Sequence, residues 1–239
     1  MDLNKISVNS DGNWKGPEQN DYSIINGKLD VEVCFKEIED FIISKIEKHS
    51  YIVGCVAWLT NKNILKALSK KSNVSIIVQE EDFLRPDSSF DGHKTNWKNK
   101  IRCLYDNLPK RCIYLMDLSG ESINVAGDQG EIIGGIRRLG KLNTEKSPAF
   151  PRMHNKFIVC YDGGGLSDGG KILNGEVLTG SFNFSENSNN SLENVVCLKD
   201  PDIVDAFIKQ YTEICLMSVE LDWNGDWEPQ PNNGLRYGT

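Results

Sequence analysis

Two short segments of the chain hold side chains that could do chemistry together. The first reads MHNKFIVCYD and places His154 and Lys156 two positions apart in an apolar run typical of a β-strand. The second reads VLTGSFNF and places Ser181 and Asn183 at the same spacing at the end of another strand-like run. Side chains two residues apart in a strand project to the same face. We therefore expect the members of each pair to lie side by side.

An imidazole, an ammonium, a hydroxyl and a carboxamide form a set that suits a phosphodiester substrate. The imidazole of His154 can attack phosphorus and form a phosphohistidine, which water then hydrolyses. Lys156, Ser181 and Asn183 can hold the non-bridging oxygens as negative charge builds on them. The sequence shows no carboxylate cluster typical of Mg²⁺ sites beside these residues, and their chemistry needs no metal. We expect neither a metal nor another cofactor.

Together the two segments resemble the signature of the phospholipase D superfamily. That signature is H-x-K, four residues, D, and then G-S-x-N or G-G-x-N. The residues that match it are His154, Lys156, Gly180, Ser181 and Asn183. The resemblance implies an α/β fold and phosphodiester hydrolysis without metal. Taken alone, each of these residues would more often be a surface or turn residue.

The resemblance also implies a role for Glu193. Single-motif nucleases of the superfamily carry a glutamate at about this distance beyond G-S-x-N. Glu193 is therefore implied as the partner of one imidazole nitrogen of His154, where a carboxylate would fix the tautomer and stabilise the imidazolium. Glu186 is the alternative carboxylate, and the structural alternative for Glu193 is a solvent-facing position at the start of a strand.

The acidic residue of the signature is displaced by one position. Tyr161 stands where the superfamily has aspartate, and Asp162 follows it. Asp162 therefore has the opposite strand parity, unless a β-bulge restores it. The gap between Asp162 and Gly180 is rich in glycine, which indicates a flexible hairpin. This departure motivates one alternative, a catalytically idle binding module with the same fold.

The chain contains a single H-x-K, and neither His49 nor His93 repeats it. Phosphodiester hydrolysis of this kind uses one imidazole to attack phosphorus and a second to protonate the leaving oxygen. Superfamily members with one motif pair as homodimers, so we expect a homodimer with a composite active site. If the protein were an active monomer, His93 would be the candidate for the second imidazole.

Charge is distributed unevenly along the chain. The formal net charge is −7, yet residues 94–156 carry twelve Lys or Arg against six Asp or Glu. A local positive field beside the candidate site would attract a polyanion. We therefore name Arg137, Arg138 and Arg152 as candidate substrate-binding residues and expect DNA or RNA as the partner. The structural alternative is a solvated helix face followed by a charged loop.

Other features narrow the class of protein. No apolar run approaches the length of a membrane span, and the N-terminus lacks the pattern of a secretory signal. The seven cysteines are scattered, and most fall in apolar periodic segments, as expected for buried thiols in a reducing compartment. Cys103, Cys112 and His93 fit no standard zinc spacing. We expect a cytoplasmic protein without a stable membrane association.

The first half of the chain alternates helix and strand signals. Apolar residues at helical spacing predict a helix over 30–48, and the run 51–58 predicts a buried strand. Asn61 can cap a second helix over 61–71, which the apolar strand 74–79 follows. Helix and strand in alternation, with short connections, predict parallel strands.

The second half carries the candidate site. We expect a helix over 97–108, a strand over 111–118, and a hairpin followed by a loop over 119–150. The two motif strands, a strand over 193–198 and a helix capped at Asp200 complete the fold. The predicted architecture is a single α/β domain over 28–218 with a mixed, largely parallel sheet flanked by helices. Residues 1–27 and 219–239 are expected to be irregular.

The residues and the resemblance together predict a metal-independent phosphodiesterase. We expect a nuclease that hydrolyses DNA or RNA through a phosphohistidine, because the basic segment precedes the motif and no membrane element is found. A phospholipid phosphodiesterase is the enzymatic alternative and would need an interfacial helix or an apolar rim. The idle nucleic-acid-binding module is the alternative from another class.

Overall fold

A computed structural model describes residues 7–8, 14–15, 30–81, 84, 92–109, 114–116, 122–124, 135–140, 152–162 and 172–221. Most of the segments expected to be irregular, 1–27 and 219–239, lie outside these residues, as does most of the glycine-rich gap. Ser7–Val8 (β1) pairs with Trp14–Lys15 (β2) in an antiparallel ribbon. Within the described ranges no helix has the length and apolar character that crossing a bilayer requires.

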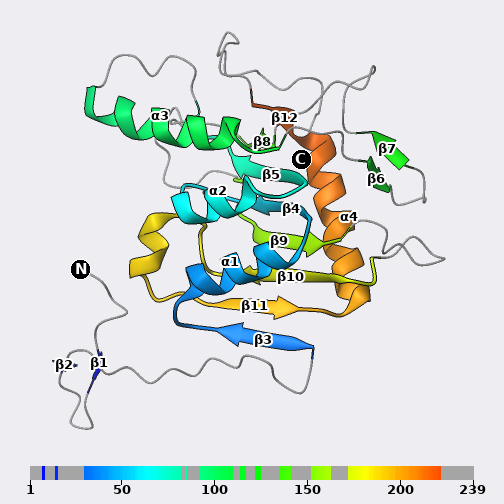
Figure 1. Ribbon diagram of the computed structural model, residues 1–239, viewed down its shortest axis with the longest axis horizontal. Helices are drawn as coiled ribbons and strands as arrows, with labels where there is room; N and C mark the ends of the chain where they lie inside the picture. The colour runs from blue at the N-terminus through cyan, green and yellow to red at the C-terminus, as the bar shows by residue number, and fades with distance from the viewer. Residues whose placement is uncertain are drawn as a thin grey trace.

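An eight-stranded sheet forms the centre of the fold, with strand order β12-β8-β5-β4-β9-β10-β11-β3 (Figure 1). Its strands are Val31–Cys34 (β3), Tyr51–Val56 (β4), Asn73–Gln79 (β5), Ile136–Leu139 (β8), Lys156–Tyr161 (β9), Gly175–Gly180 (β10), Val195–Leu198 (β11) and Val219–Glu220 (β12).

Strand direction confirms one part of the predicted sheet and corrects another. The sheet is mixed and flanked by helices, as expected. It is not largely parallel, because only β4–β5 and β5–β8 are parallel among its described pairs. β9, β10, β11 and β3 all pair antiparallel. In the described residues no α-helix lies between β9 and β10 or between β10 and β11, and a parallel pair needs a long crossover between its strands.

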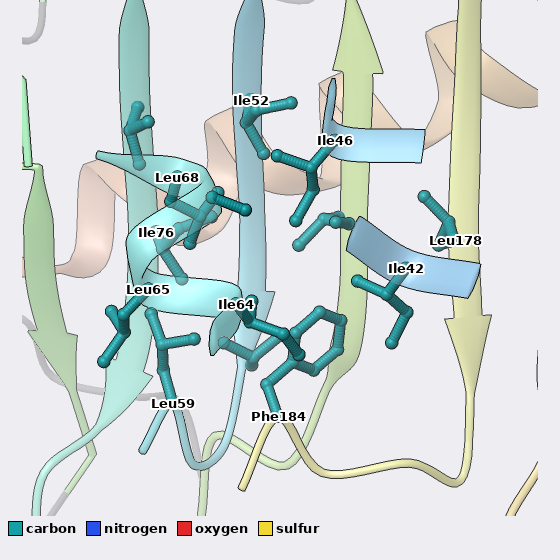
Figure 2. Close-up of a cluster of buried hydrophobic side chains, with 14 of the residues drawn as sticks. Ile42, Ile46, Ile52, Leu59, Ile64, Leu65, Leu68, Ile76, Leu178 and Phe184 are labelled. Atoms are coloured by element: carbon teal, nitrogen blue, oxygen red, sulfur yellow. The ribbon is translucent and has the colours of Figure 1, made fainter. Parts of the chain in front are cut away.

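Helices cover both faces of the sheet. Ile38–Lys48 (α1), Lys62–Leu68 (α2) and Gly92–Asp106 (α3) contribute to one buried cluster, whereas Pro201–Met217 (α4) contributes to the other. Figure 2 shows the first cluster, with α1 and α2 in front of the strands. Its labelled side chains are Ile42, Ile46, Ile52, Leu59, Ile64, Leu65, Leu68, Ile76, Leu178 and Phe184.

Strand β4 shows why the sequences of the central strands are continuous apolar runs. Ile52 and Val56 face the helices α1–α3, whereas Val53 and Cys55 face α4. A strand buried on both faces loses the alternation between apolar and polar residues that marks a half-exposed strand. This geometry confirms the strands predicted over 51–58 and 74–79 and their parallel pairing.

The helix predicted over 30–48 is wrong in its first part. Val31–Cys34 is an edge strand that pairs with β11, and helix α1 begins only at Ile38. Glu37 lies between them in the left-handed conformation, at φ 52° and ψ 39°. Over so short a stretch, the spacing of the apolar residues fits the period of a helix as well as the period of a strand. Pairing with β11 decides in favour of the strand, and this pairing is not visible in the local sequence.

Local capping signals predict the starts of α2 and α4 correctly. The side chain of Asn61 accepts hydrogen bonds from the N–H groups of Asn63 and Ile64, and Asp200 accepts from the first turn of α4 in the same way. The loop expected around residue 137 is instead strand β8. The strand expected over 111–118 contains Tyr114–Met116 (β6), which pairs with Ser122–Asn124 (β7) outside the main sheet.

Candidate active site

Three antiparallel strands bring the motif segments to one edge of the sheet. The register pairs Phe157 with Thr179 between β9 and β10, and Gly180 with Val195 between β10 and β11. Residues before β9, after β10 and before β11 therefore meet at the same edge. His154 precedes its strand, and Ser181 follows its own. The expectation that the paired residues share strand faces is thus wrong in detail, because His154, Ser181 and Asn183 lie in the connections beyond the strand ends and only Lys156 lies within a strand.

The predicted His–Lys pair is in contact. Nζ of Lys156 lies 3.2 Å from Nε2 and 3.4 Å from Nδ1 of the His154 imidazole. The same ammonium also donates a hydrogen bond to the backbone oxygen of His154, at 3.2 Å. His154 is exposed and Lys156 is half-buried. The cation is therefore placed to hold an oxygen of a phosphate that approaches the imidazole.

Ser181 joins the second motif to the strand that follows it. Its hydroxyl donates a hydrogen bond to the carboxylate of Glu193 and accepts one from the backbone N–H of Asn194, at 3.1 Å. Its own N–H donates to the backbone oxygen of Asn194, also at 3.1 Å. Glu193 thus lies at the candidate site, with Ser181 as its hydrogen-bond partner. Its implied pairing with the imidazole of His154 stays a prediction.

Gly180 is needed for this close approach. A Cβ atom at Gly180 would lie 2.2 Å from the backbone oxygen of Asn194, which is far inside van der Waals contact. Any other residue would push apart the ends of β10 and β11 and displace Ser181. The glycine of G-S-x-N therefore has a steric role.

Alternating burial explains how Asn183 is presented. Phe182 and Phe184 are buried, and their rings meet edge to face with centroids 6.0 Å apart, so they anchor the segment in the core. Asn183 lies between them, and its Oδ1 atom is buried with no hydrogen-bond partner among the described residues. Buried polar atoms are nearly always paired, so an unpaired one at a candidate site suits contact with a ligand.

Two further residues that the sequence did not suggest hold the backbone beside His154. The buried side chain of Gln79 accepts a hydrogen bond from the N–H of Met153, at 2.7 Å. Gly140 packs against Gln79 at a positive φ of 108°, where a Cβ atom would lie 2.6 Å from Oε1 of Gln79. On the other side of His154, the backbone oxygen of Asn155 accepts from the N–H of Ala57, at 2.9 Å.

The environment keeps the imidazole of His154 neutral. Partial burial and the positive charges of Lys156 and Arg152 lower the pKa of His154 below its usual value of 6.5. Burial also lowers the pKa of Lys156, although the charge of Glu193 opposes this effect. A lowered histidine pKa leaves the ring unprotonated at neutral pH, which is the form that can attack phosphorus.

We expect the acid limb of the kcat/KM profile to lie below pH 6.5, because the neutral imidazole persists to lower pH when its pKa is lowered. Arg152→Gln removes one of the charges that lower this pKa, so the limb should move to higher pH. Lys209→Gln, which removes a cation from the exposed surface of α4, is the matched control. A limb that stays in place in Arg152→Gln would mean that another group controls it.

The arginines named as substrate-binding residues have different surroundings. Arg152 is exposed, two positions before His154. Arg137 donates to the hydroxyl and the backbone oxygen of Ser218, at 2.6 and 2.8 Å. Arg138 forms an ion pair with Glu80, at 2.6 Å. Their role in binding stays a prediction, and Arg152 is the one beside the candidate nucleophile.

Asp162 lies at the other end of β9 from the site. It accepts a hydrogen bond from the N–H of Ser50 at 2.8 Å, and its Oδ2 lies 3.2 Å from Nδ1 of His49. Six residue steps of strand separate it from Lys156, or roughly 20 Å. Its observed contacts anchor the connection between α1 and β4. Across the ranges given above, no three His, Cys, Asp or Glu side chains gather as metal ligands.

Comparison with known proteins identifies the family. Residues 42–215 match the family model described as cardiolipin synthase, PLD-like domain. The match spans most of the chain and includes every candidate catalytic residue named above. The chain therefore belongs to the phospholipase D-like family, which confirms the resemblance found in the sequence.

A relative and three solved structures are also similar to this chain. The uncharacterized protein L381 of Acanthamoeba polyphaga mimivirus is 30% identical over 194 residues, which are 79% of this chain and 66% of that protein. The chain thus spans just under two thirds of that relative's length.

The solved structures are more distant. Nuc from Salmonella typhimurium, a phospholipase D family member, is 16% identical with a TM-score of 0.45 and covers 80% of this chain and 96% of its own. NucT from Helicobacter pylori is 12% identical with a TM-score of 0.43, and the coverages are 80% and 98%. TrmBL2, an archaeal chromatin protein described with a novel mode of DNA binding, is 13% identical with a TM-score of 0.38. The match covers 82% of this chain and 56% of that chain.

Proposed function

We propose that this protein is a nuclease that hydrolyses DNA or RNA without a metal ion. The observation that carries the proposal is the convergence of His154, Lys156, Ser181 and Asn183 at one edge of the sheet, with an exposed imidazole whose pKa is lowered. A nucleic-acid substrate is favoured by the exposed cation of Arg152 beside His154 and by the excess of basic residues over 94–156.

The proposed reaction has two steps. A ring nitrogen of His154 forms a bond to phosphorus while the bond to the leaving oxygen breaks, and a second imidazole gives that oxygen its proton. Water then attacks phosphorus, the P–N bond breaks, and the second imidazole takes a proton from the water. Lys156 and the amide of Asn183 hold the non-bridging oxygens, where charge builds in both transition states.

We propose that the second imidazole is the His154 of another copy of the chain. One imidazole cannot be nucleophile and general acid in the same step, and the chain has one H-x-K. A two-fold axis through the exposed edge at His154 would place both rings on one phosphate and make the interface isologous.

Subunit mixing tests this arrangement. Wild-type chains mixed with an excess of His154→Ala chains should form heterodimers with a single imidazole and little activity, so that the variant suppresses the wild type. The measurement is specific activity against mixing ratio, with sedimentation to confirm heterodimers. Heterodimers that keep half the wild-type activity would show that each chain holds a complete site.

The proposed function is tested by one panel of substrates in EDTA. We expect cleavage of plasmid DNA, single-stranded DNA or RNA in the presence of EDTA, and no release of headgroup from phosphatidylglycerol vesicles. His154→Ala protein, purified in parallel, controls for contaminating nucleases.

Each other outcome of the panel contradicts the proposal in a different way. Activity lost in EDTA and restored by Mg²⁺ would mean metal-dependent chemistry. Hydrolysis of vesicles alone would favour a lipid phosphodiesterase. Binding of nucleic acid without cleavage of any substrate would favour the idle binding module.

A further inference from the structure

An aromatic side chain with no role in phosphodiester chemistry lies against the candidate nucleophile. Trp58 follows β4 by two residues, and its indole meets the imidazole of His154 edge to face, with ring centroids 5.8 Å apart and planes at 82°. Trp58 is half-exposed, whereas its neighbours Ala57 and Leu59 are each 1% exposed. The chain thus turns its two small or aliphatic side chains inward and leaves the indole at the site.

The structure holds this indole in place. Its only donor, Nε1–H, bonds to Oε1 of Glu81 at 3.1 Å. The backbone on either side is fixed to the two motif segments, because Ala57 donates to the oxygen of Asn155 and Thr60 donates to the oxygen of Phe184, at 2.9 and 2.8 Å. With its donor occupied and its backbone fixed, Trp58 can offer a ligand only its aromatic surface.

We propose that Trp58 is a stacking surface for a nucleobase next to the scissile phosphate, and that the substrate is therefore single-stranded or unpaired nucleic acid. The inference rests on the proposed nuclease function. A base can lie flat on an aromatic side chain only after it leaves its own stack, so an aromatic surface selects unpaired strands. A lipid headgroup presents no planar ring of this kind.

The alternative is that Trp58 only orients His154. An edge-to-face contact restricts rotation of the imidazole, so truncation of the indole would then slow the reaction on every substrate. A stacking role instead predicts a loss confined to substrates that carry bases. The two roles therefore differ in their response to removal of the bases.

The experiment compares a single-stranded oligothymidylate with an abasic oligomer of the same length and backbone. Trp58→Ala should lower kcat/KM on the oligothymidylate by about 5- to 100-fold, mostly through KM, and Trp58→Phe should restore most of it. On the abasic oligomer both variants should match the wild type. Tyr51→Ala, which changes an aromatic residue at the opposite end of β4, is the matched control and should keep the preference for bases.

Binding measured in the His154→Ala background separates this inference from the proposed function. His154→Ala protein should bind the oligothymidylate more tightly than the abasic oligomer and the duplex, and adding Trp58→Ala should remove both preferences. If these preferences appear but the wild type cleaves nothing, the nuclease proposal fails and the stacking role stands. Equal losses on both oligomers, or no loss on either, would overturn the stacking role.

Discussion

His154→Ala should abolish phosphodiester cleavage without unfolding the protein. The imidazole is the proposed nucleophile, and it is exposed at this edge of the sheet. We expect cleavage to fall by at least about 10³-fold. Because His154 is exposed, we expect the free energy of unfolding in urea to change by about 0.5 kcal/mol or less.

Neighbouring variants make this test specific. Lys156→Ala should cost about 10²- to 10³-fold in kcat, because the ammonium is proposed to act on the charge of the transition state. Asn155→Ala is the matched control, because its exposed side chain lies between the two and only its backbone oxygen has a described contact. It should keep most of the wild-type activity. Retention of more than a few per cent of activity in His154→Ala would rule out the nucleophile assignment.

Features encoded by near neighbours in the sequence could be predicted. The apolar runs of β4 and β5 are long enough to identify, and Asn61 and Asp200 cap their helices within three residues. The candidate site also follows from local pairs, since His154 and Lys156 are two positions apart, as are Ser181 and Asn183. Antiparallel pairing of β9, β10 and β11, which the sequence did not indicate, then brings these pairs together.

Features that depend on pairing over long distances could not be predicted. Strand β3 is defined by β11, more than 150 residues away, and β8 by its parallel register with β5. Gln79 supports the backbone before His154 from a different strand, and nothing in its own neighbourhood indicates this. The place of Trp58 at the site could not be predicted either, because an aromatic residue after a buried strand usually belongs to the core.

A buried group of charged side chains also could not be predicted, because its members lie far apart in the sequence. The side chain of Lys45 on α1 forms ion pairs with Glu32 of β3 and Glu176 of β10, and all three side chains are 5% exposed or less. Nε2 of His49 lies 3.4 Å from Oε1 of Glu176. Helical spacing placed Lys45 one position before a buried isoleucine and suggested no partner. The group ties α1 to two strands of the sheet.

Lys45→Met should be the most destabilising single substitution in this group. Methionine keeps the apolar stem of the lysine but leaves two carboxylates buried without their shared cation. Breaking a buried pair by removing one partner typically costs about 3–5 kcal/mol. The matched control is Lys209→Met, which breaks an exposed pair with Asp205 on α4 and should cost about 0.5 kcal/mol or less. The measurement is urea unfolding at pH 7.

The pH dependence of this loss identifies its cause. Burial alone would raise the pKa of Glu176, but the hydrogen bond from His49, the charge of Lys45 and the thiol of Cys197 outweigh it and lower the pKa to about 2. A carboxylate with a lowered pKa stabilises the fold above its usual value of 4.5, and this contribution disappears as the pH falls from 4.5 towards 2. The wild type should therefore lose stability over this interval.

In Lys45→Met these carboxylates lose one of the groups that favour their charged form, although Lys199 stays beside Glu32 and His49 beside Glu176. Protonation at low pH therefore costs the variant less stability than it costs the wild type. The difference in unfolding free energy between wild type and Lys45→Met should therefore narrow as the pH falls from 7 to about 3. If the difference stays constant over this range, the loss comes from packing, including the contact of the ammonium with the ring of Phe41 at 5.1 Å. If Lys45→Met is as stable as the wild type at pH 7, the carboxylates have found water or another partner, and the ion pairs do not hold α1 against the sheet.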